Sequence, residues 1–145
     1  RTLSKAYALA GSRCGTLIAG EEIVSLLKRI IPPYAIPEST VEDVLRLTEA
    51  PQRAIAGERI RTLLVEREKM RARLEVNPAV VKVFPSDANF LLVKCRDARR
   101  FLATGQSVGL LVRDFSSAPG LAGCLRISIG TPEQNERLLA AVERS

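Results

Sequence analysis

The chain has no histidine and no tryptophan, and its 145 residues include only two tyrosines, four phenylalanines and three cysteines. The cysteines, Cys14, Cys95 and Cys124, are far apart in the sequence and form no C-x-x-C pair. Without histidine or paired thiols, the chain lacks the usual ligand sets of zinc sites. We therefore expect no metal site, and each thiol is better explained as a small buried apolar side chain than as a redox group.

Long apolar segments are also missing, although 46% of the residues are hydrophobic, which is ordinary for a globular protein. No run approaches the roughly 20 apolar residues that cross a bilayer, and no segment resembles a signal peptide. The sequence therefore predicts no membrane partner and, by default, the reducing cytoplasm as the location.

Positive charge is in excess, with 22 Lys and Arg against 16 Asp and Glu, a formal net charge of +6. Such an excess raises the question of a nucleic-acid partner. The basic residues alternate with acidic ones, as in residues 58–61 (ERIR) and 66–69 (EREK), a pattern typical of a solvated helix face. The few aromatic residues do not alternate with the cations as stacking platforms would. We therefore expect no nucleic-acid partner, and the charge suits either a phosphorylated ligand or an ordinary surface.

What the sequence does contain is a lysine and an arginine near its start, Lys5 and Arg13, separated by small residues in RTLSKAYALAGSRCG. A lysine amine that reacts with a carbonyl compound must lose its proton, so enzymes place it on a short rigid segment near other positive charge. A phosphate group needs a cationic fork and hydroxyl donors, which Arg13 with Ser4 and Thr2 could supply. A lone lysine is ordinarily a solvated surface charge, but the combined pattern favours an anchor for pyridoxal phosphate.

Two structural parts are predicted, divided near residue 50. The first part begins with the lysine segment and continues with a short strand at residues 14–19 and a helix at residues 21–31, ended by Pro32 and Pro33. A second helix runs to about residue 49. It is predicted to start at a cap formed by Ser39 or Thr40, with Glu42 and Asp43 in its first turn.

The second part begins with a long amphipathic helix at residues 52–76, ended by Asn77-Pro78. Its apolar stripe is predicted to be Ile55, Ile60, Leu63, Leu64 and Leu74. Strands are predicted at residues 80–84, 89–94, 110–113 and 124–129, with a helix at residues 98–104. A last helix starts at Pro132, with Thr131 as its N-cap and Gln134 completing a capping box. These elements favour a small antiparallel or mixed sheet covered by helices on one side.

Two arginines in the second part are candidates for anion binding. Arg126 lies in the alternating segment LRISI, so it points away from the face that carries Leu125 and Ile127. A guanidinium forms two parallel hydrogen bonds to a carboxylate or phosphate. Arg113 ends an apolar strand just before a loop with Gly and Ser. For both arginines an ion pair is the alternative, with Asp114 or another acid for Arg113 and with a nearby acid for Arg126.

Several segments resemble a known family. TLSKAYALAGSRCG is similar to the lysine segment of fold-type I, pyridoxal-phosphate-dependent aminotransferases, especially the histidinol-phosphate aminotransferase family. Residues 30–37 (IIPPYAIP), 86–94 (SDANFLLVK), 110–115 (LLVRDF) and 123–135 (GCLRISIGTPEQN) occur in the order and spacing of the C-terminal part of that family.

The resemblance implies an α/β fold made of two pieces of a longer enzyme. Residues 1–50 would form the end of the large domain that binds pyridoxal phosphate, and residues 51–145 the α+β C-terminal small domain. Enzymes of this family are generally homodimers, and the acid that pairs with the pyridine nitrogen is expected upstream of Arg1. The resemblance therefore implies that residues 1–145 alone are inactive or nearly so.

The resemblance also implies roles for individual residues. Lys5 would hold pyridoxal 5'-phosphate and transfer the proton between substrate and cofactor, and the absence of histidine leaves it without the usual competitor for that task within these residues. The remaining contacts implied are Ser4, Arg13, Thr2 and Tyr34 near the cofactor, and Arg126 and Arg113 on the anionic end of the substrate. The implied reaction converts histidinol phosphate and 2-oxoglutarate to imidazole acetol phosphate and glutamate in histidine biosynthesis.

Two alternatives to this function remain open. The chain could belong to another fold-type I enzyme, such as an aromatic or aspartate aminotransferase or a phosphothreonine decarboxylase. It could also be a noncatalytic module in which Arg13, Arg113 and Arg126 bind anions, which predicts no covalent cofactor. For Tyr34, packing of a loop tyrosine is the alternative to a place near the active site.

Overall fold

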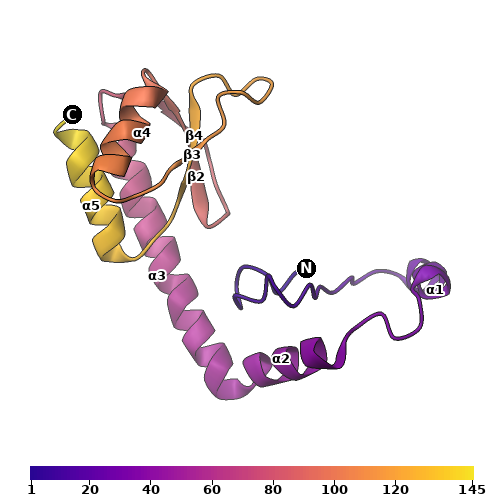
Figure 1. Ribbon diagram of the computed structural model, residues 1–145. Helices are drawn as coiled ribbons and strands as arrows, with labels where there is room; N and C mark the ends of the chain where they lie inside the picture. Colours follow the sequence, from indigo (N-terminus) through magenta and orange to yellow (C-terminus); the bar gives the residue numbers. More distant parts are fainter. The chain divides into compact units, whose positions relative to one another are not determined.

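The computed structural model describes residues 1–145 and divides into two compact units, Arg1–Ile60 and Arg61–Ser145. The first unit contains helices α1 (Glu21–Ile30) and α2 (Glu38–Thr48) (Figure 1). Helix α3 (Ala50–Glu75) begins in the first unit and ends in the second. No helix of the chain has both the length and the apolar character needed to cross a membrane.

Helix α1 confirms the helix predicted for this segment. Glu21 and Glu22 lie in its first turn and Lys28 and Arg29 in its last, which suits the helix dipole. The helix ends at Ile30 because the following residue, Ile31, is extended, as expected before a proline. Its apolar face is largely exposed, at 54–75% for the side chains Ile23, Leu26 and Ile30.

The predicted start of α2 is wrong. The helix begins at Glu38, after Pro37, whose fixed φ of −57° prepares the chain for the first turn. Thr40 therefore lies inside the helix, and its hydroxyl donates to the Ser12 carbonyl at 3.1 Å instead of capping. Glu38 is the acidic residue of the first turn, and Asp43 accepts a hydrogen bond from the Ser12 hydroxyl at 3.1 Å.

The strand predicted at residues 14–19 is also wrong. A strand needs a hydrogen-bonded neighbour along its length, and this segment has only one bridged pair, Thr2 with Gly15. All strands of the structure lie in the second unit.

The second unit contains a four-stranded antiparallel sheet in the order β1-β2-β4-β3. The strands are β1 (Val80–Val83), β2 (Phe90–Cys95), β3 (Arg113–Asp114) and β4 (Cys124–Ser128). Helices α4 (Ala98–Ser107) and α5 (Pro132–Glu143) lie with the C-terminal end of α3 on one side of this sheet (Figure 1). The predicted sheet with helices on one side is therefore confirmed.

The third strand is shorter than predicted. Residues 110–112 are not in a strand, because the amide of Leu110 donates to the Gly105 carbonyl at the end of α4. Only Arg113 and Asp114 pair with β4.

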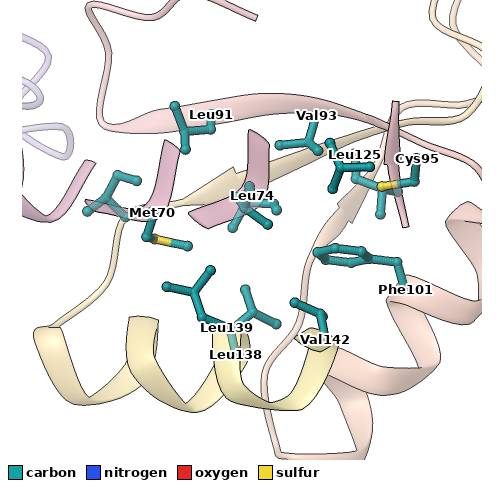
Figure 2. Close-up of a cluster of buried hydrophobic side chains, with 13 residues drawn as sticks. Met70, Leu74, Leu91, Val93, Cys95, Phe101, Leu125, Leu138, Leu139 and Val142 are labelled. Carbon is teal, nitrogen blue, oxygen red and sulfur yellow. The ribbon is translucent and has the colours of Figure 1, made fainter. Parts of the chain in front are cut away.

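The core of the second unit lies between the sheet and its helices. Alternation along β2 and β4 turns Leu91, Val93, Leu125 and Ile127 to the buried side. Figure 2 shows these two strands facing α5 and Phe101 of α4. Full burial of one such side chain contributes about 1.5–3 kcal/mol. The other fully or largely buried members are Met70, Leu74, Val80, Cys95, Ile129, Leu138, Leu139 and Val142.

The apolar stripe predicted for α3 is mostly wrong. Of its five residues, Leu74 is fully buried and Leu63 packs partly against the core, whereas Ile55, Ile60 and Leu64 are exposed. The buried face of α3 in the second unit instead combines Met70 and Leu74 with two charged residues, Glu66 and Arg67. Hydropathy periodicity missed this face because charged residues can be buried once they are hydrogen-bonded.

Some predicted helix boundaries around the core are confirmed, but α4 continues to Ser107 instead of ending at residue 104, and α3 begins at Ala50 instead of residue 52. Helix α5 starts at Pro132, with Thr131 as N-cap and Gln134 completing the capping box. Helix α3 ends just before Asn77, whose buried side-chain amide donates to the Val142 carbonyl at 3.3 Å.

Two of the three cysteines are buried, as the sequence predicts for small apolar side chains. Cys95 and Cys124 are 4% and 2% exposed, and all three thiols are free. Burial raises the pKa of the Cys95 thiol to about 11. Cys95 is therefore protonated, and not a nucleophilic thiolate, at neutral pH.

Glu66 joins α3 to the start of α5. Its carboxylate accepts hydrogen bonds from Lys69 Nζ at 2.9 Å and from Asn135 Nδ2 at 3.0 Å. The Asn135 side chain also accepts a hydrogen bond from the Gly130 amide at 2.8 Å and donates one to the Gly130 carbonyl at 3.2 Å. The Asn135 side chain therefore stabilises the turn that follows β4. The hydrogen bonds from Lys69 and then Asn135 lower the pKa of Glu66, against the opposing effect of burial.

Replacing Glu66 with glutamine is expected to lower the free energy of unfolding at neutral pH by about 1 kcal/mol, because a charged hydrogen bond is lost. A depressed pKa means that Glu66 stabilises the fold above its ordinary pKa of about 4.5 and loses this effect as the pH falls through the lower folded-state value. The difference between wild type and Glu66→Gln should therefore shrink on acidification. Urea denaturation at neutral pH and near pH 3 measures it.

The matched control is Glu42→Gln, which changes an exposed carboxylate of α2 that has no ion pair. This variant should match wild type at both pH values. A Glu66→Gln difference that stays constant or grows on acidification would contradict the assignment.

Candidate active site

The lysine segment folds into a loop that is closed at its base. Thr2 and Gly15 form an antiparallel bridge, and the Thr16 amide donates to the Arg1 carbonyl at 2.7 Å. A Cβ atom at position 15 would lie 3.1 Å from the Arg1 carbonyl oxygen, so the close approach of the two ends favours glycine there. Lys5 and Arg13, eight positions apart in the sequence, are thus on one closed loop, as the small residues between them predict.

Backbone hydrogen bonds form turns on the lysine side of this loop. The Tyr7 amide donates to the Leu3 carbonyl and the Ala8 amide to the Lys5 carbonyl, both at 3.3 Å. Leu9, which is 5% exposed, anchors the loop in the first unit. The Lys5 side chain is exposed, and its amine has no hydrogen bond or ion pair. No partner within the chain blocks the Lys5 amine, so a carbonyl compound can reach it.

Arg13 has a backbone conformation that is unusual for a side-chain-bearing residue. Its φ of 51° lies in the left-handed region, and such a residue costs of order 1–3 kcal/mol unless its surroundings hold it. The guanidinium donates one hydrogen bond, from Nη1 to the Ala10 carbonyl at 3.3 Å, and pairs with no acid. Most of its donors are therefore available to a ligand.

A hollow of about 400 Å³ lies beside Arg13. Hydroxyl groups of Ser12, Ser39 and Thr40 lie among its lining residues, which also include Gly11, Cys14, Gly15, Ala35, Ile36 and Pro37. The hydroxyl protons of Ser12 and Thr40 are donated to Asp43 and to the Ser12 carbonyl, so the side-chain donors left for a phosphate are the Arg13 guanidinium and the Ser39 hydroxyl. The sequence reasoning missed Ser39 and Thr40 here, because only the turn before α2 brings them next to Arg13.

Not every residue expected near the cofactor borders this hollow. Ser4 is half-buried and Thr2 exposed, and both lie on the closed loop with Lys5. Tyr34 is fully exposed and has a left-handed φ of 58°. Neither Lys5 nor Tyr34 is among the lining residues. The roles of these four residues therefore stay predictions.

In the second unit, Arg126 and Arg113 lie opposite each other on neighbouring strands. They are register partners in the β4–β3 pair, so both side chains are on the same face of the sheet. This face is opposite the core, because Leu125 and Ile127, the neighbours of Arg126, are buried in it. Arg126 is half-buried and Arg113 exposed.

Neither arginine is neutralised by an acid of this chain. No ion pair involves Arg126 or Arg113, and Nε of Arg126 is buried without a hydrogen-bond partner. The ion pair considered for Arg113 is absent, because Asp114 accepts a hydrogen bond from the Ser116 amide at 2.8 Å instead. Hydrogen bonds from Ser116 lower the pKa of Asp114. Two like charges on one sheet face without a counter-ion suit an anionic ligand.

Aromatic rings take the place of an acid beside Arg126. Its guanidinium lies 5.3 Å from the ring centre of Phe90 and 5.6 Å from that of Phe115. The sequence reasoning missed both phenylalanines, because their place depends on strand pairing that no local pattern encodes. The lysine loop of the first unit and the arginine pair of the second unit are each compatible with the class of enzymes in which a lysine carries a phosphorylated carbonyl cofactor.

Comparison with known proteins agrees with this class. The family model "Aminotransferase class I and II" matches residues 1–142. Over 142 residues the chain is 43% identical to the histidinol-phosphate aminotransferase of Stenotrophomonas maltophilia (strain R551-3), covering 98% of this chain and 39% of that protein. The chain therefore belongs to the class I and II aminotransferase family, and it spans about two fifths of the length of the curated relatives that it matches.

Solved structures show the same fold. L-threonine-O-3-phosphate decarboxylase from Porphyromonas gingivalis matches with a TM-score of 0.80 and 23% identity, covering 99% of this chain and 44% of that chain. Histidinol-phosphate aminotransferase from Sinorhizobium meliloti, in complex with pyridoxal-5'-phosphate, matches with a TM-score of 0.75 and 24% identity, covering 99% and 39%. The expected fold class, the mixed helix and strand fold of fold-type I aminotransferases, is confirmed.

Proposed function

We propose that this chain is the C-terminal part of a pyridoxal-phosphate-dependent histidinol-phosphate aminotransferase. The observation that carries the proposal is the closed loop, which presents a free lysine amine and an arginine without an acidic partner on one short segment. The 43% identity to a relative with that name supports the choice of substrate. The products would be imidazole acetol phosphate and glutamate, formed from histidinol phosphate and 2-oxoglutarate.

The loop carries the chemical groups that the cofactor of this reaction would need, although Thr2, Ser4 and Lys5 do not border the hollow beside Arg13. Arg13, with the hydroxyls of Ser4 and Thr2, would hold the phosphate, and Lys5 would hold the aldehyde end. Once bound, pyridoxal phosphate supplies a conjugated ring that stores the electrons of the substrate's C–H bond. Lys5 Nζ would take the proton from the amine-bearing carbon of histidinol phosphate and, in the second half-reaction, would deliver a proton to the carbon of 2-oxoglutarate that becomes the amine-bearing carbon of glutamate. Tyr34 is assigned to the neighbourhood of the cofactor by resemblance alone.

Arg126 and Arg113 would bind the anionic end of each substrate. The amine substrate ends in a phosphate and the oxo acid in a carboxylate, and a guanidinium forms two parallel hydrogen bonds to either group. The pair therefore explains how one site could serve both half-reactions. Binding of the anion would also orient the substrate carbon, which is worth a large part of the rate acceleration in such reactions.

Other parts of the proposal concern the complete enzyme. Residues 1–50 would belong to its large cofactor-binding domain and residues 51–145 to its small domain, and the enzyme would be a cytoplasmic homodimer. The relatives are much longer than this chain, which covers 39% of one of them. We expect the acid that pairs with the pyridine nitrogen to come from the uncovered part, so residues 1–145 alone should show no turnover.

One rival activity has specific support. The likeness to a phosphothreonine decarboxylase has a TM-score of 0.80, and its phosphorylated amino-acid substrate would suit the same arginines. Aromatic and aspartate aminotransferases, and a noncatalytic anion-binding module, are the remaining alternatives. They differ from the proposal in their products or in having no covalent cofactor.

The test compares substrates with and without phosphate on the complete gene product. With 2-oxoglutarate present, kcat/KM for histidinol phosphate should exceed that for histidinol by at least about 100-fold, because histidinol lacks the phosphate that would pair with the guanidinium groups of Arg126 and Arg113. Glutamate formation measures the reaction. Carbon dioxide release from phosphothreonine without glutamate formation would favour the decarboxylase, and no reaction with any amine would favour the binding module.

A further inference from the structure

The guanidinium of Arg126 is flanked by aromatic rings from both neighbouring strands. Strand β4, which carries Arg126, lies between β2 and β3 in the sheet. Phe90 is the first residue of β2, and Phe115 directly follows β3 and donates its amide to the Cys124 carbonyl at 3.0 Å. The two ring centres lie 5.3 Å and 5.6 Å from the guanidinium carbon, within the range of cation–π attraction.

This arrangement leaves the two ends of the guanidinium in different surroundings. Nε of Arg126 is buried and has no partner. The two terminal nitrogens, Nη1 and Nη2, form no hydrogen bond within the chain and are accessible to solvent. Nε is therefore closed to a ligand and the terminal nitrogens are open, which suits the end-on geometry of a guanidinium bound to two oxygens of one anion.

Rings hold a cation in a way that an acidic side chain cannot. A carboxylate beside Arg126 would orient it, but would also neutralise it and occupy the hydrogen-bond donors that a substrate needs. A phenyl ring attracts the cation through its face and has no strong hydrogen-bond acceptor. The two phenylalanine rings thus restrain the guanidinium and leave its charge and its donors available.

We infer that Phe90 and Phe115 are positioning residues that hold Arg126 for end-on binding of the substrate's carboxylate or phosphate. The inference rests on the proposed function, in which Arg126 binds that anion. It adds that the two phenylalanines act through Arg126 and do not touch the reacting atoms. Their loss should weaken substrate binding and leave the chemical step largely unchanged.

The test uses Phe115→Leu and Phe90→Leu in the complete gene product loaded with pyridoxal phosphate. Each variant should raise the KM for 2-oxoglutarate about five- to twentyfold while kcat stays within about twofold, because the lost cation–π attraction affects binding only. The Kd of glutarate, an unreactive dicarboxylate, should rise by the same factor in calorimetry. Phe115→Tyr should restore values within about twofold of wild type, since tyrosine keeps the ring face.

Phe84→Leu is the matched control. Phe84 is half-buried in the same unit, but the cation beside its ring is Lys82, with Nζ 4.8 Å from the ring centre, and not Arg126. This variant should bind glutarate like wild type. Equal weakening in Phe84→Leu, or failure of tyrosine to restore binding, would mean that the phenylalanines act only through packing. Melting temperatures show whether each variant is folded. If Phe115→Leu does not fold, Phe90→Leu tests the same prediction.

Arg126→Lys distinguishes failure of the proposed role of Arg126 from failure of the positioning role of the phenylalanines. If Arg126→Lys binds glutarate like wild type, the proposed role of Arg126 is wrong and the inference about the phenylalanines fails with it. If Arg126→Lys weakens binding but both leucine variants bind like wild type, the proposed function stands and the positioning role alone is overturned.

Discussion

Replacing Lys5 with alanine or arginine is expected to abolish covalent attachment of pyridoxal phosphate and to lower kcat for transamination by at least about 10³-fold. Alanine removes the amine that the reaction needs. Arginine keeps the positive charge, but its guanidinium stays protonated at any working pH and is a poor nucleophile. Both variants should therefore fail alike, which separates the chemistry of the amine from its charge.

The measurement is borohydride reduction of the complete gene product in the presence of pyridoxal phosphate, followed by mass mapping of the labelled peptides. Wild type should carry one adduct, on Lys5. Lys28→Arg is the control, because Lys28 is another exposed lysine of the first unit, in the last turn of α1. Its adduct and turnover should match wild type. Labels spread over surface lysines, or normal turnover in Lys5→Ala, would refute the lysine assignment and favour a noncatalytic module.

Replacing Arg126 with lysine should lower kcat/KM for histidinol phosphate and for glutamate by about 100-fold, mostly through KM. Lysine keeps the charge but cannot offer two parallel donors, and its flexible ammonium is a poorer match for the two phenylalanine rings than a planar guanidinium. The half-buried position of Arg126 makes its contribution larger than that of exposed Arg113. Arg113→Lys should therefore cost only about tenfold.

Steady-state kinetics with each substrate tests this order of effects. Arg137→Lys is the control, since Arg137 is an exposed residue of α5. It should leave both kinetic constants unchanged. A larger effect at Arg113 than at Arg126 would place the main anion contact on β3 instead of β4, and unchanged kinetics in both variants would remove the sheet face from the proposed site.

Local sequence patterns predicted much of the second unit for physical reasons. Alternation in residues 124–129 assigned Leu125 and Ile127 to the core and Arg126 to the other face, because successive side chains of a strand point in opposite directions. The capping box of Thr131 and Gln134 marked the start of α5, since both of its hydrogen bonds lie within four residues. Each of these signals depends only on neighbours in the sequence.

The errors occurred where distant residues compete with a local signal. Thr40 was expected to cap α2, but a hydrogen bond to the Ser12 carbonyl engages its hydroxyl. Residues 14–19 were expected to form a strand, but only Gly15 finds a pairing partner. Glu66 was taken for a solvated charge, whereas Lys69 and Asn135 satisfy it in a buried position.

For the candidate site too, local sequence indicated some features, whereas others depend on distant residues. The order of residues alone indicated Lys5 and Arg13 as a pair, because the seven residues between them, five of which have small side chains, can close into one loop. It also indicated the family, through segments distributed along the whole chain. The roles of Lys5, Arg13, Tyr34 and the two strand arginines stay predictions until the variants are measured.

By itself, the sequence determined the buried face of β4, the start of α5 and the family that the chain resembles. Only the tertiary structure decided that Arg113 lies opposite Arg126 and that the rings of Phe90 and Phe115 both lie beside the same guanidinium. Strand register and sheet order bring together residues that are up to 36 positions apart, and these depend on the packing of the whole unit against its core.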